Sequence, residues 1–408
     1  MSTSILYHSW GLRNTVYVST NYRKGATIFN IKHSMKSLKC SICGSKNIIK
    51  KGTVEREFRT LPVGSRPTLL SLPVQRVECR DCNHIRQVKI GFADEKCSHT
   101  HSFVRYALDL LKGTTIKFVA HHLGVSWDVI KGIQKRHLTR RYSKPKLRNL
   151  KYIAIDEVNV GKGKFLTIVL NLLSGAVVFV GTGRDTDALL PFWKRLKASK
   201  AKIKAVAMDM GRAYIAAAKE HLKKVDVVFD RFHVMKLMND KLTKLRSKIQ
   251  KEATTKLGKK TIKGTRWLLV SNSESLEVNR IGNKLSQREQ LERALKINEP
   301  LACAYYLKED LRLFWAQESK EAAQQFLQDW IDRAMESGIK LMKTMAKTLA
   351  TYRYGLIAWY KHQISTGPLE GLNNKIGAMQ RQSYGIRDQD FLKLKIYGLH
   401  ETKYALIG

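Results

Sequence analysis

The sequence is poor in acidic residues for its length. Its 408 residues include 34 Asp and Glu but 74 Lys and Arg, which gives a net charge of +40 at pH 7 and an isoelectric point near 10.1. A chain this basic repels itself in isolation, so we expect a polyanionic partner. The basic residues are spread along the whole length, which favours an extended nucleic-acid surface over a basic tail. A merely soluble basic protein is the alternative.

Cysteine and long apolar runs are scarce as well. Four of the six cysteines form two CxxC pairs, and Cys97 and Cys303 remain. This usage points to a reducing compartment rather than to a disulfide-rich secreted domain. The sequence shows no run of about 18 apolar residues and no charged-then-apolar leader, so we expect no membrane span and a cytoplasmic location.

The two CxxC pairs predict a structural zinc site. Each pair places two thiolates on one tight knuckle, and two knuckles together make a tetrahedral zinc site. Gly44 and Asn83 follow the two pairs and suit the positive-φ turns that such knuckles need. A redox pair is the alternative, but no βαβ pattern surrounds either motif. The expected zinc ligands are Cys40, Cys43, Cys79 and Cys82.

Residues 102–138 show the pattern of a helix-turn-helix. A first helix reaches Gly113, a second spans Ile116–His122 before Gly124, and Ser126 is the expected N-cap of a third, basic helix. Such a third helix enters the major groove of DNA. An ordinary helical hairpin is the alternative. The expected DNA contacts lie in this helix and in the basic linker behind it, at Lys131, Gln134, Lys135, Arg136, Arg140 and Arg141.

Two acidic residues follow predicted strands in the middle of the chain. Residues 151–181 read as three short strands, the first of which ends at Asp156, and a later strand ends at Asp209. The order of strands and helices predicts a mixed sheet with α/β crossovers. If the two strands are parallel neighbours, both carboxylates emerge at one end of the sheet and suit two Mg²⁺ (or Mn²⁺) ions for phosphodiester chemistry. Acids that only cap a helix are the alternative.

From Val234 to about His362 the strand pattern gives way to amphipathic helices. Segment 263–270 is expected to be a short exception to the helical pattern, and Trp267 within it is expected to be a buried anchor rather than a base-stacking residue. A stripe of apolar residues in this block predicts core packing rather than a cofactor pocket. Its members are Leu301, Tyr305, Leu311, Phe314 and Trp315.

A last helix is predicted to begin at Gly367-Pro368, because Pro is favoured in a first helical turn. Glu370 lies near its start, and Asn374 and Arg381 share its face. An acid, an amide and a base on one face suit a metal ion that also touches a phosphate, and Asn374 and Arg381 are expected DNA contacts. The alternative is a helix that is merely stabilised by Glu at the positive end of its dipole.

With these residues in place, the chain resembles bacterial insertion-sequence transposases of the ISL type, which combine an N-terminal zinc-binding module, a helix-turn-helix and an RNase H-like DDE core. The resemblance rests on the motifs CSIC, CRDC, YIAIDE, VAMDM, DRFH and GPLEGLNNKI, and it covers about residues 38–405 in the expected order. It implies that Asp156, Asp209 and Glu370 are the catalytic, metal-binding triad. It also implies that Asp230 and His233 form a supporting motif, with His233 auxiliary to catalysis.

The resemblance implies a fold and a domain order. The expected fold is an RNase H-like mixed α/β sheet interrupted by an all-α insertion and preceded by the zinc module and helix-turn-helix. The expected segments are a zinc-binding N-terminal region (1–100), a helix-turn-helix with basic linker (101–147), a first part of the core (148–233), the insertion (234–362) and the C-terminal core helices (363–408).

The implied function is metal-dependent DNA cleavage followed by strand transfer. The terminal inverted repeats of the element, as double-stranded DNA, would be bound by the zinc module and helix-turn-helix. Metal-dependent hydrolysis would expose a 3′-OH that attacks target DNA. Two ends must be cut together, so a homodimer or higher synaptic assembly is expected, in the bacterial cytoplasm in association with the nucleoid.

Two other functions fit part of the sequence. A catalytically silent DNA-binding protein, such as a domesticated transposase or a regulator, shares the zinc module, the helix-turn-helix and the charge, but it has no use for three acids in a metal-binding arrangement. An RNase H-like nuclease would use the acids but would need no strand transfer and no recognition of terminal repeats. Cleavage and strand-transfer assays separate the three.

Overall fold

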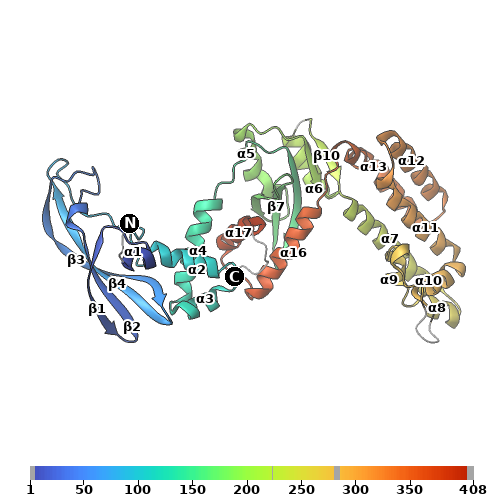
Figure 1. Ribbon diagram of the computed structural model, residues 1–408. Coiled ribbons are helices and arrows are strands. Elements are labelled where there is room, and N and C mark those ends of the chain that lie inside the picture. Colours follow the sequence, from blue (N-terminus) through green and yellow to red (C-terminus); the bar gives the residue numbers. More distant parts are fainter. Residues whose placement is uncertain (1–4, 223, 280–284, 402–408) are drawn as a thin grey trace. The chain divides into compact units, whose positions relative to one another are not determined.

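The computed structural model describes residues 5–222, 224–279 and 285–401 (Figure 1). The chain forms two compact units. The first contains residues 1–143 and 376–408, and the second contains residues 144–375. Within the described residues, no helix is both long and apolar enough to cross a membrane.

The first unit begins with a five-stranded sheet in the order β1-β2-β4-β3, with β5 paired to β4. β3 and β4 form a long antiparallel hairpin, and β2 runs parallel to β4. The sheet and the short helix α1 (Ile5–Trp10) share a core in which Phe58, Leu70 and Leu72 are fully buried. The strands are β1 (Thr15–Arg23), β2 (Ala26–His33), β3 (Ile48–Val63), β4 (Arg66–Cys79) and β5 (Ile85–Gln87).

The expected three helices follow this sheet, and they are α2 (His101–Leu110), α3 (Ile116–Leu123) and α4 (Trp127–Tyr142). Gly124 ends α3 in the left-handed region at φ 60°, as a helix C-terminus favours. Ser126 occupies the predicted N-cap position of α4, but its side chain makes no capping hydrogen bond. The helix is instead held by its apolar face.

A further helix, α17 (Gln389–Gly398), belongs to this helical core. Phe391 of α17 is 2% exposed and packs in the same cluster as Phe103, Ile130 and Ile133 of the helix-turn-helix. The C-terminal part of the chain therefore completes the core of the predicted DNA-binding domain. Sequence patterns did not reveal this, because the two segments lie far apart in the chain.

The second unit contains a mixed five-stranded sheet in the order β10-β9-β6-β7-β8. β6, β9 and β10 are parallel to one another, whereas β7 and β8 are antiparallel to their neighbours. This confirms the predicted mixed sheet and its RNase H-like character. The elements are β6 (Tyr152–Asn159), β7 (Phe165–Asn171), β8 (Val177–Thr182), α5 (Leu190–Ser199), β9 (Ala205–Met208), α6 (Arg212–His221) and β10 (Asp226–Phe229).

An all-helical block follows β10, as expected. Figure 1 shows α7 leading from the sheet into this block. The predicted apolar stripe is buried, and the indole N–H of Trp330 donates to the Leu307 carbonyl at 2.8 Å. The helices are α7 (Arg231–Glu252), α8 (Lys256–Ile262), α9 (Arg266–Val270), α10 (Gln287–Lys296), α11 (Glu299–Leu313), α12 (Lys320–Glu336), α13 (Lys340–Thr351), α14 (Arg353–Ile357), α15 (Trp359–His362) and α16 (Gly367–Gln382).

The prediction for segment 263–270 was wrong. Residues 266–270 are the helix α9, and Trp267 is 68% exposed rather than a buried anchor. α9 buries Leu269 instead, whose carbonyl accepts a hydrogen bond from Lys308 at 3.0 Å. Lys308 is 1% exposed and also donates to the Ser271 carbonyl at 2.8 Å, so a lysine from α11 satisfies the end of this short helix.

The helical block returns to the sheet at Gly355 of α14. A Cβ atom built at Gly355 would lie 2.3 Å from the Phe229 ring, and Phe229 is the last, fully buried residue of β10. Gly355→Ala is expected to destabilise the protein by about 1–3 kcal/mol, because the ring has no free space to move into. The measurement is the unfolding midpoint in guanidinium chloride.

Gly371→Ala is the matched control, because its Cβ would meet nothing within 4 Å and it lies inside the helix α16. It is expected to stabilise the protein by about 0.5–1 kcal/mol through helix propensity. Equal midpoints for the two variants would contradict the proposed packing at Gly355.

Candidate functional site

Asp156 and Asp209 each follow the last residue pair of the parallel β6–β9 ladder. β9 ends at Met208, but β6 continues through Asp156 to Asn159 while paired with β7, so the prediction that the first strand ends at Asp156 was wrong. Ile155 of β6 pairs with Met208 of β9, so the next residue of each strand is an aspartate. The prediction that these strands are parallel neighbours is confirmed. Each carboxylate accepts a hydrogen bond from the backbone N–H of the residue after it, at 2.8 Å for Asp156 and 2.5 Å for Asp209. The two side chains are thereby oriented at one edge of the sheet.

Asp156 is costly to keep charged at this position. Burial raises its pKa above the usual range, and the nearby charge of Asp209 raises it further. The amide of Asn373 and the ring of His233 act in the opposite direction. A divalent cation would favour the charged form of both carboxylates, and carboxylate oxygens are the ligands that Mg²⁺ prefers. The donor set therefore fits the metal that the sequence predicted.

Helix α16 contacts the aspartate pair through Asn373. Its side-chain N–H donates to the second carboxylate oxygen of Asp156 at 3.1 Å. Sequence analysis had singled out the next residue, Asn374, which is exposed. Glu370 lies three residues before Asn373, one turn earlier on the same face of α16, and its side chain is exposed. The three-residue spacing from Glu370 was the signal in the sequence for Asn373.

Asp230 connects the end of β10 to the start of α16. It is 3% exposed, caps α7 by accepting the Phe232 N–H at 3.0 Å, and accepts the Thr366 N–H at 3.1 Å. His233, one turn into α7, has its Nδ1 atom 3.6 Å from the same carboxylate. Asp230 raises the pKa of His233, and the charges of Asp209 and Asp156 raise it further. The histidine ring is thus held in the electrostatic field of the aspartate pair.

The four cysteines of the zinc module converge as predicted. Their Sγ atoms all lie within 4.8 Å of one another. The backbone turns after the two pairs have positive φ, 76° at Gly44 and 52° at Asn83, as expected for two knuckles. Within the described residues, no other group of three or more metal-binding side chains is this compact. The triad acids do not reach that spacing, and both aspartates turn one oxygen toward backbone N–H groups.

The predicted DNA contacts on α4 do not all face solvent. Lys131 and Lys135 bind Asp388 at 3.0 and 2.9 Å, and Arg141 binds Glu401 at 2.6 Å. These partners come from α17 and the residues flanking it. Two acids therefore partly offset the charge of these three cations within the first unit.

The position of Gln134 does not suit the expected DNA contact. Its side chain is 3% exposed, because it lies on the face of α4 that also buries Ile130 and Ile133. Arg136 is exposed, and Arg140 is 78% exposed with Asp94 at 3.5 Å. Outside α4, Asn374 and Arg381 are exposed on α16.

Two exposed aromatic residues near the start of α3 and α4 were not singled out from the sequence. Phe118 is 55% exposed and stacks on His122 at 5.9 Å, and Trp127 is 46% exposed beneath the Lys131 ammonium at 5.2 Å. The local signal was their position outside the i, i+3, i+4 pattern of the buried residues.

Known proteins match the chain over nearly all of the regions described above. A family model for the ISL3 transposase DDE domain, described as a transposase, matches residues 153–396. A model for the zinc-finger of the transposases of IS204, IS1001, IS1096 and IS1165 matches residues 36–82. A model for the helix-turn-helix domain of transposase family ISL3 matches residues 88–138. The first model covers the strands and helices that carry all three acids.

Individual relatives agree with the models. The transposase of insertion sequence element IS1001 from Bordetella parapertussis is 28% identical over 370 residues, 90% of this chain and 89% of the relative. The transposase of IS1557 from Mycobacterium tuberculosis is 25% identical over 380 residues, 87% of this chain and 84% of the relative.

Among solved structures, the Drosophila P element transposase strand transfer complex matches 74% of this chain and 92% of its own, with a TM-score of 0.40 and 13% identity. The chain belongs to the transposase family ISL3.

Proposed function

We propose that the protein is a DDE transposase that binds the terminal inverted repeats of its insertion sequence and catalyses metal-dependent DNA cleavage and strand transfer to target DNA. Membership of the ISL3 family supports a DNA-processing enzyme. The observation that carries the finer proposal is the pairing of β6 with β9, which presents Asp156 and Asp209 at one edge of the sheet next to the helix of Glu370.

In the proposed site, Asp156, Asp209 and Glu370 hold Mg²⁺ or Mn²⁺. A divalent metal ion bound there stabilises the negative charge that develops on the scissile phosphodiester. Asn373 orients the Asp156 carboxylate through its 3.1 Å hydrogen bond. Asp230 lies 3.6 Å from the Nδ1 atom of His233 and raises the pKa of the ring, which is proposed to contact a phosphate oxygen. His233 is therefore proposed as auxiliary to the triad.

Hydrolysis at the element's end would expose a 3′-OH, and that hydroxyl would then attack target DNA in line. Neither step needs a covalent bond between DNA and protein, so the chain's task is to position the strands. The zinc module and the helix-turn-helix are proposed to hold the terminal repeats, with Arg136 and Arg140 as the exposed cations of α4. We further propose a homodimer or higher synaptic assembly, acting at the nucleoid in the cytoplasm.

Removing an acid of the triad is expected to abolish cleavage. Asp209→Asn and Glu370→Gln should each lower the rate by about 10²–10⁴-fold, because several kcal/mol of transition-state stabilisation is lost. The assay maps new 3′ ends on a plasmid that carries the DNA flanking the coding sequence, with Mg²⁺ or Mn²⁺ present. Glu318→Gln, an exposed acid of the helical block, is the control. Full cleavage by either triad variant would refute the assignment.

If the wild type binds the flanking DNA but yields no new 3′ ends, the protein is a catalytically silent DNA-binding protein. Cuts without joining to target DNA would instead favour a nuclease. Paired 3′ ends at inverted repeats, joined to target DNA, are the outcome that the proposal requires.

Asn373 and Asn374 offer a matched pair of variants for the positioning of Asp156. Asn373→Ala removes a hydrogen bond to a charged group, worth about 1.5–3 kcal/mol, so cleavage should fall about ten- to a hundredfold and need more Mg²⁺. Asn374→Ala, at an exposed position, should leave the Mg²⁺ dependence unchanged and weaken DNA binding. Identical Mg²⁺ titrations for both variants would contradict this role of Asn373.

Loss of zinc is expected to unfold the two knuckles and thereby to weaken DNA binding. Cys79→Ser replaces one of four clustered ligands, and Cys79 is fully buried. Bound zinc, measured by atomic absorption, should fall from about one per chain, and affinity for the flanking DNA should fall with it. Cys303→Ser, in the helical block, is the control and should keep both. Unchanged zinc content in Cys79→Ser would rule out the proposed ligand set.

A further inference from the structure

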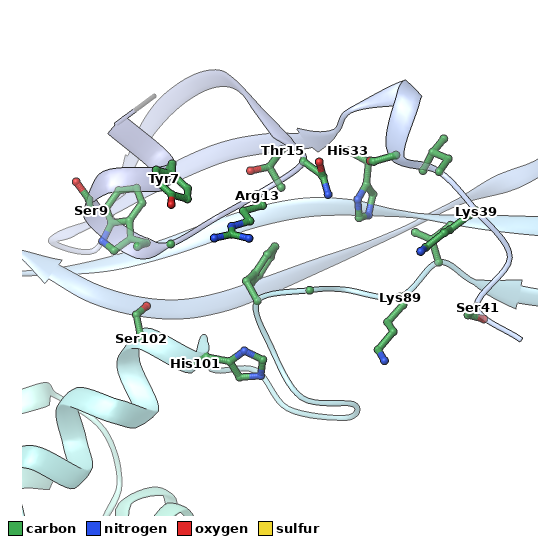
Figure 2. Close-up of a pocket in the computed structure, with 18 of the residues that line it drawn as sticks. Tyr7, Ser9, Arg13, Thr15, His33, Lys39, Ser41, Lys89, His101 and Ser102 are labelled. Atoms are coloured by element: carbon green, nitrogen blue, oxygen red, sulfur yellow. The ribbon is translucent and has the colours of Figure 1, made fainter. Parts of the chain in front are cut away.

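A large groove lies within the first unit, between the N-terminal segment, the first zinc knuckle and the start of α2. Its volume is about 1310 Å³. Figure 2 shows Arg13, His33 and Lys39 along one side and His101 and Ser102, at the start of α2, on the other. The matched zinc-finger region begins only at residue 36, so α1, β1 and β2 lie outside every matched model.

The groove carries a strong excess of positive charge. Arg13, Lys39, Lys89 and Arg105 line it and are exposed, and none of them forms an ion pair within the described part of the chain. Asp109 is the only carboxylate in the lining, and Lys112 binds it at 2.6 Å. The proposed zinc ligands Cys40 and Cys43 also line the groove, with thiolate charge that a bound zinc ion would offset. Four cations without acidic partners on facing walls favour a polyanion in the groove.

The remaining lining suits phosphate oxygens. The hydroxyl groups of Ser9 and Ser41 can donate hydrogen bonds along the groove, whereas the Ser102 hydroxyl is hydrogen-bonded to Thr100 at 2.9 Å. The N-terminus of α2, a helix of 10 residues, begins at His101 on the same wall, and its dipole favours an anion there. Serine hydroxyls, helix N-termini, lysine and arginine are the groups that contact the DNA backbone in protein–DNA complexes.

The walls of the groove are fixed by packing. Leu6 and Trp10 of α1 and the adjacent Leu12 are at most 5% exposed and belong to the core of the N-terminal sheet. The Trp10 ring contacts Phe29 of β2, with ring centroids 4.9 Å apart. Phe92, a buried member of the same core, also lines the groove. The surface that a ligand would contact is therefore pre-formed, so little conformational entropy is lost when the ligand binds.

We propose that this groove binds the sugar-phosphate backbone of duplex DNA without reading its sequence. Its volume exceeds the range of about 300–1,000 Å³ typical of small-ligand pockets, and its cations come from four separate segments rather than converging on one point. Both features suit a stretch of polymer. The proposal rests on the proposed DNA-binding function and deepens it, because it extends the DNA contact from the helix-turn-helix to the N-terminal segment.

The test measures the salt dependence of DNA binding by the full-length, zinc-loaded protein. Arg13→Ala/Lys89→Ala removes two groove cations, and Lys24→Ala/Arg66→Ala removes two exposed cations at hairpin turns outside the groove. Dissociation constants are measured over a range of NaCl concentrations for the flanking end DNA and for an unrelated duplex of equal length. Zinc content and circular dichroism verify folding, and Lys39→Ala/Arg105→Ala is the second groove variant.

The slope of log affinity against log salt is expected to flatten by about 0.9 for each lost phosphate contact, so by about 2 for a groove variant. Both duplexes should be weakened by the same factor, because backbone contacts carry no sequence information. The control should keep the wild-type slope. Tight, competing binding of a mononucleotide in the groove, lost in both groove variants, would overturn the proposal in favour of a small anionic ligand.

Three other outcomes would also overturn it: an unchanged slope in both groove variants, an equal change in the control, or a loss confined to the end DNA. If the wild type shows no preference for the end DNA, the terminal-repeat function fails instead. The proposal for the groove is then still tested by the salt-dependence slopes of the groove variants on the unrelated duplex.

Discussion

The in-register pairing of two short parallel strands is the constraint on which the proposed active site depends. Because Ile155 pairs with Met208, the next residue of each strand is an aspartate at the same edge of the sheet. The residues before them are buried on both faces, so a one-residue slip would turn both carboxylates toward apolar neighbours. Burial at this position disfavours the charged form of Asp156 and raises its pKa, and a bound cation would favour the charged form again.

The last strand, β10, also fixes the point at which the chain returns to the sheet after the long helical insertion. Asp226, at the start of β10, binds Lys361 and His362 at 2.7 Å each, and Asp230, just after its end, accepts the Thr366 N–H. Closing so long a loop costs conformational entropy, and these contacts fix its end at the sheet. The start of α16, and with it Glu370, is therefore positioned by the acid that begins β10 and the acid that directly follows it.

In the first unit, some basic side chains form ion pairs within the fold and others stay available to a ligand. Asp388, beside α17, binds both Lys131 and Lys135, whereas the groove cations such as Arg13 and Lys89 have no acidic partner among the described residues. With acids so scarce, each ion pair withdraws a cation from the surface offered to DNA. The cations that the fold leaves unpaired mark the surface available to a polyanion.

The sequence by itself determined what local pattern encodes: the two knuckles, the three helices, the strands that carry or precede Asp156 and Asp209, and the start of α16. It did not give the end of β6, which continues past Asp156 to Asn159 because its pairing with β7 is longer than its pairing with β9. Spacing and burial periodicity act over a few residues, so they can be recognised without a structure. Tertiary structure decided which side of a helix meets which partner. In the folded chain Gln134 is buried, Trp267 is exposed, and Asn373 rather than Asn374 donates a hydrogen bond to Asp156. Helix α17 packs against the helix-turn-helix. These outcomes depend on contacts between segments that are distant in the chain.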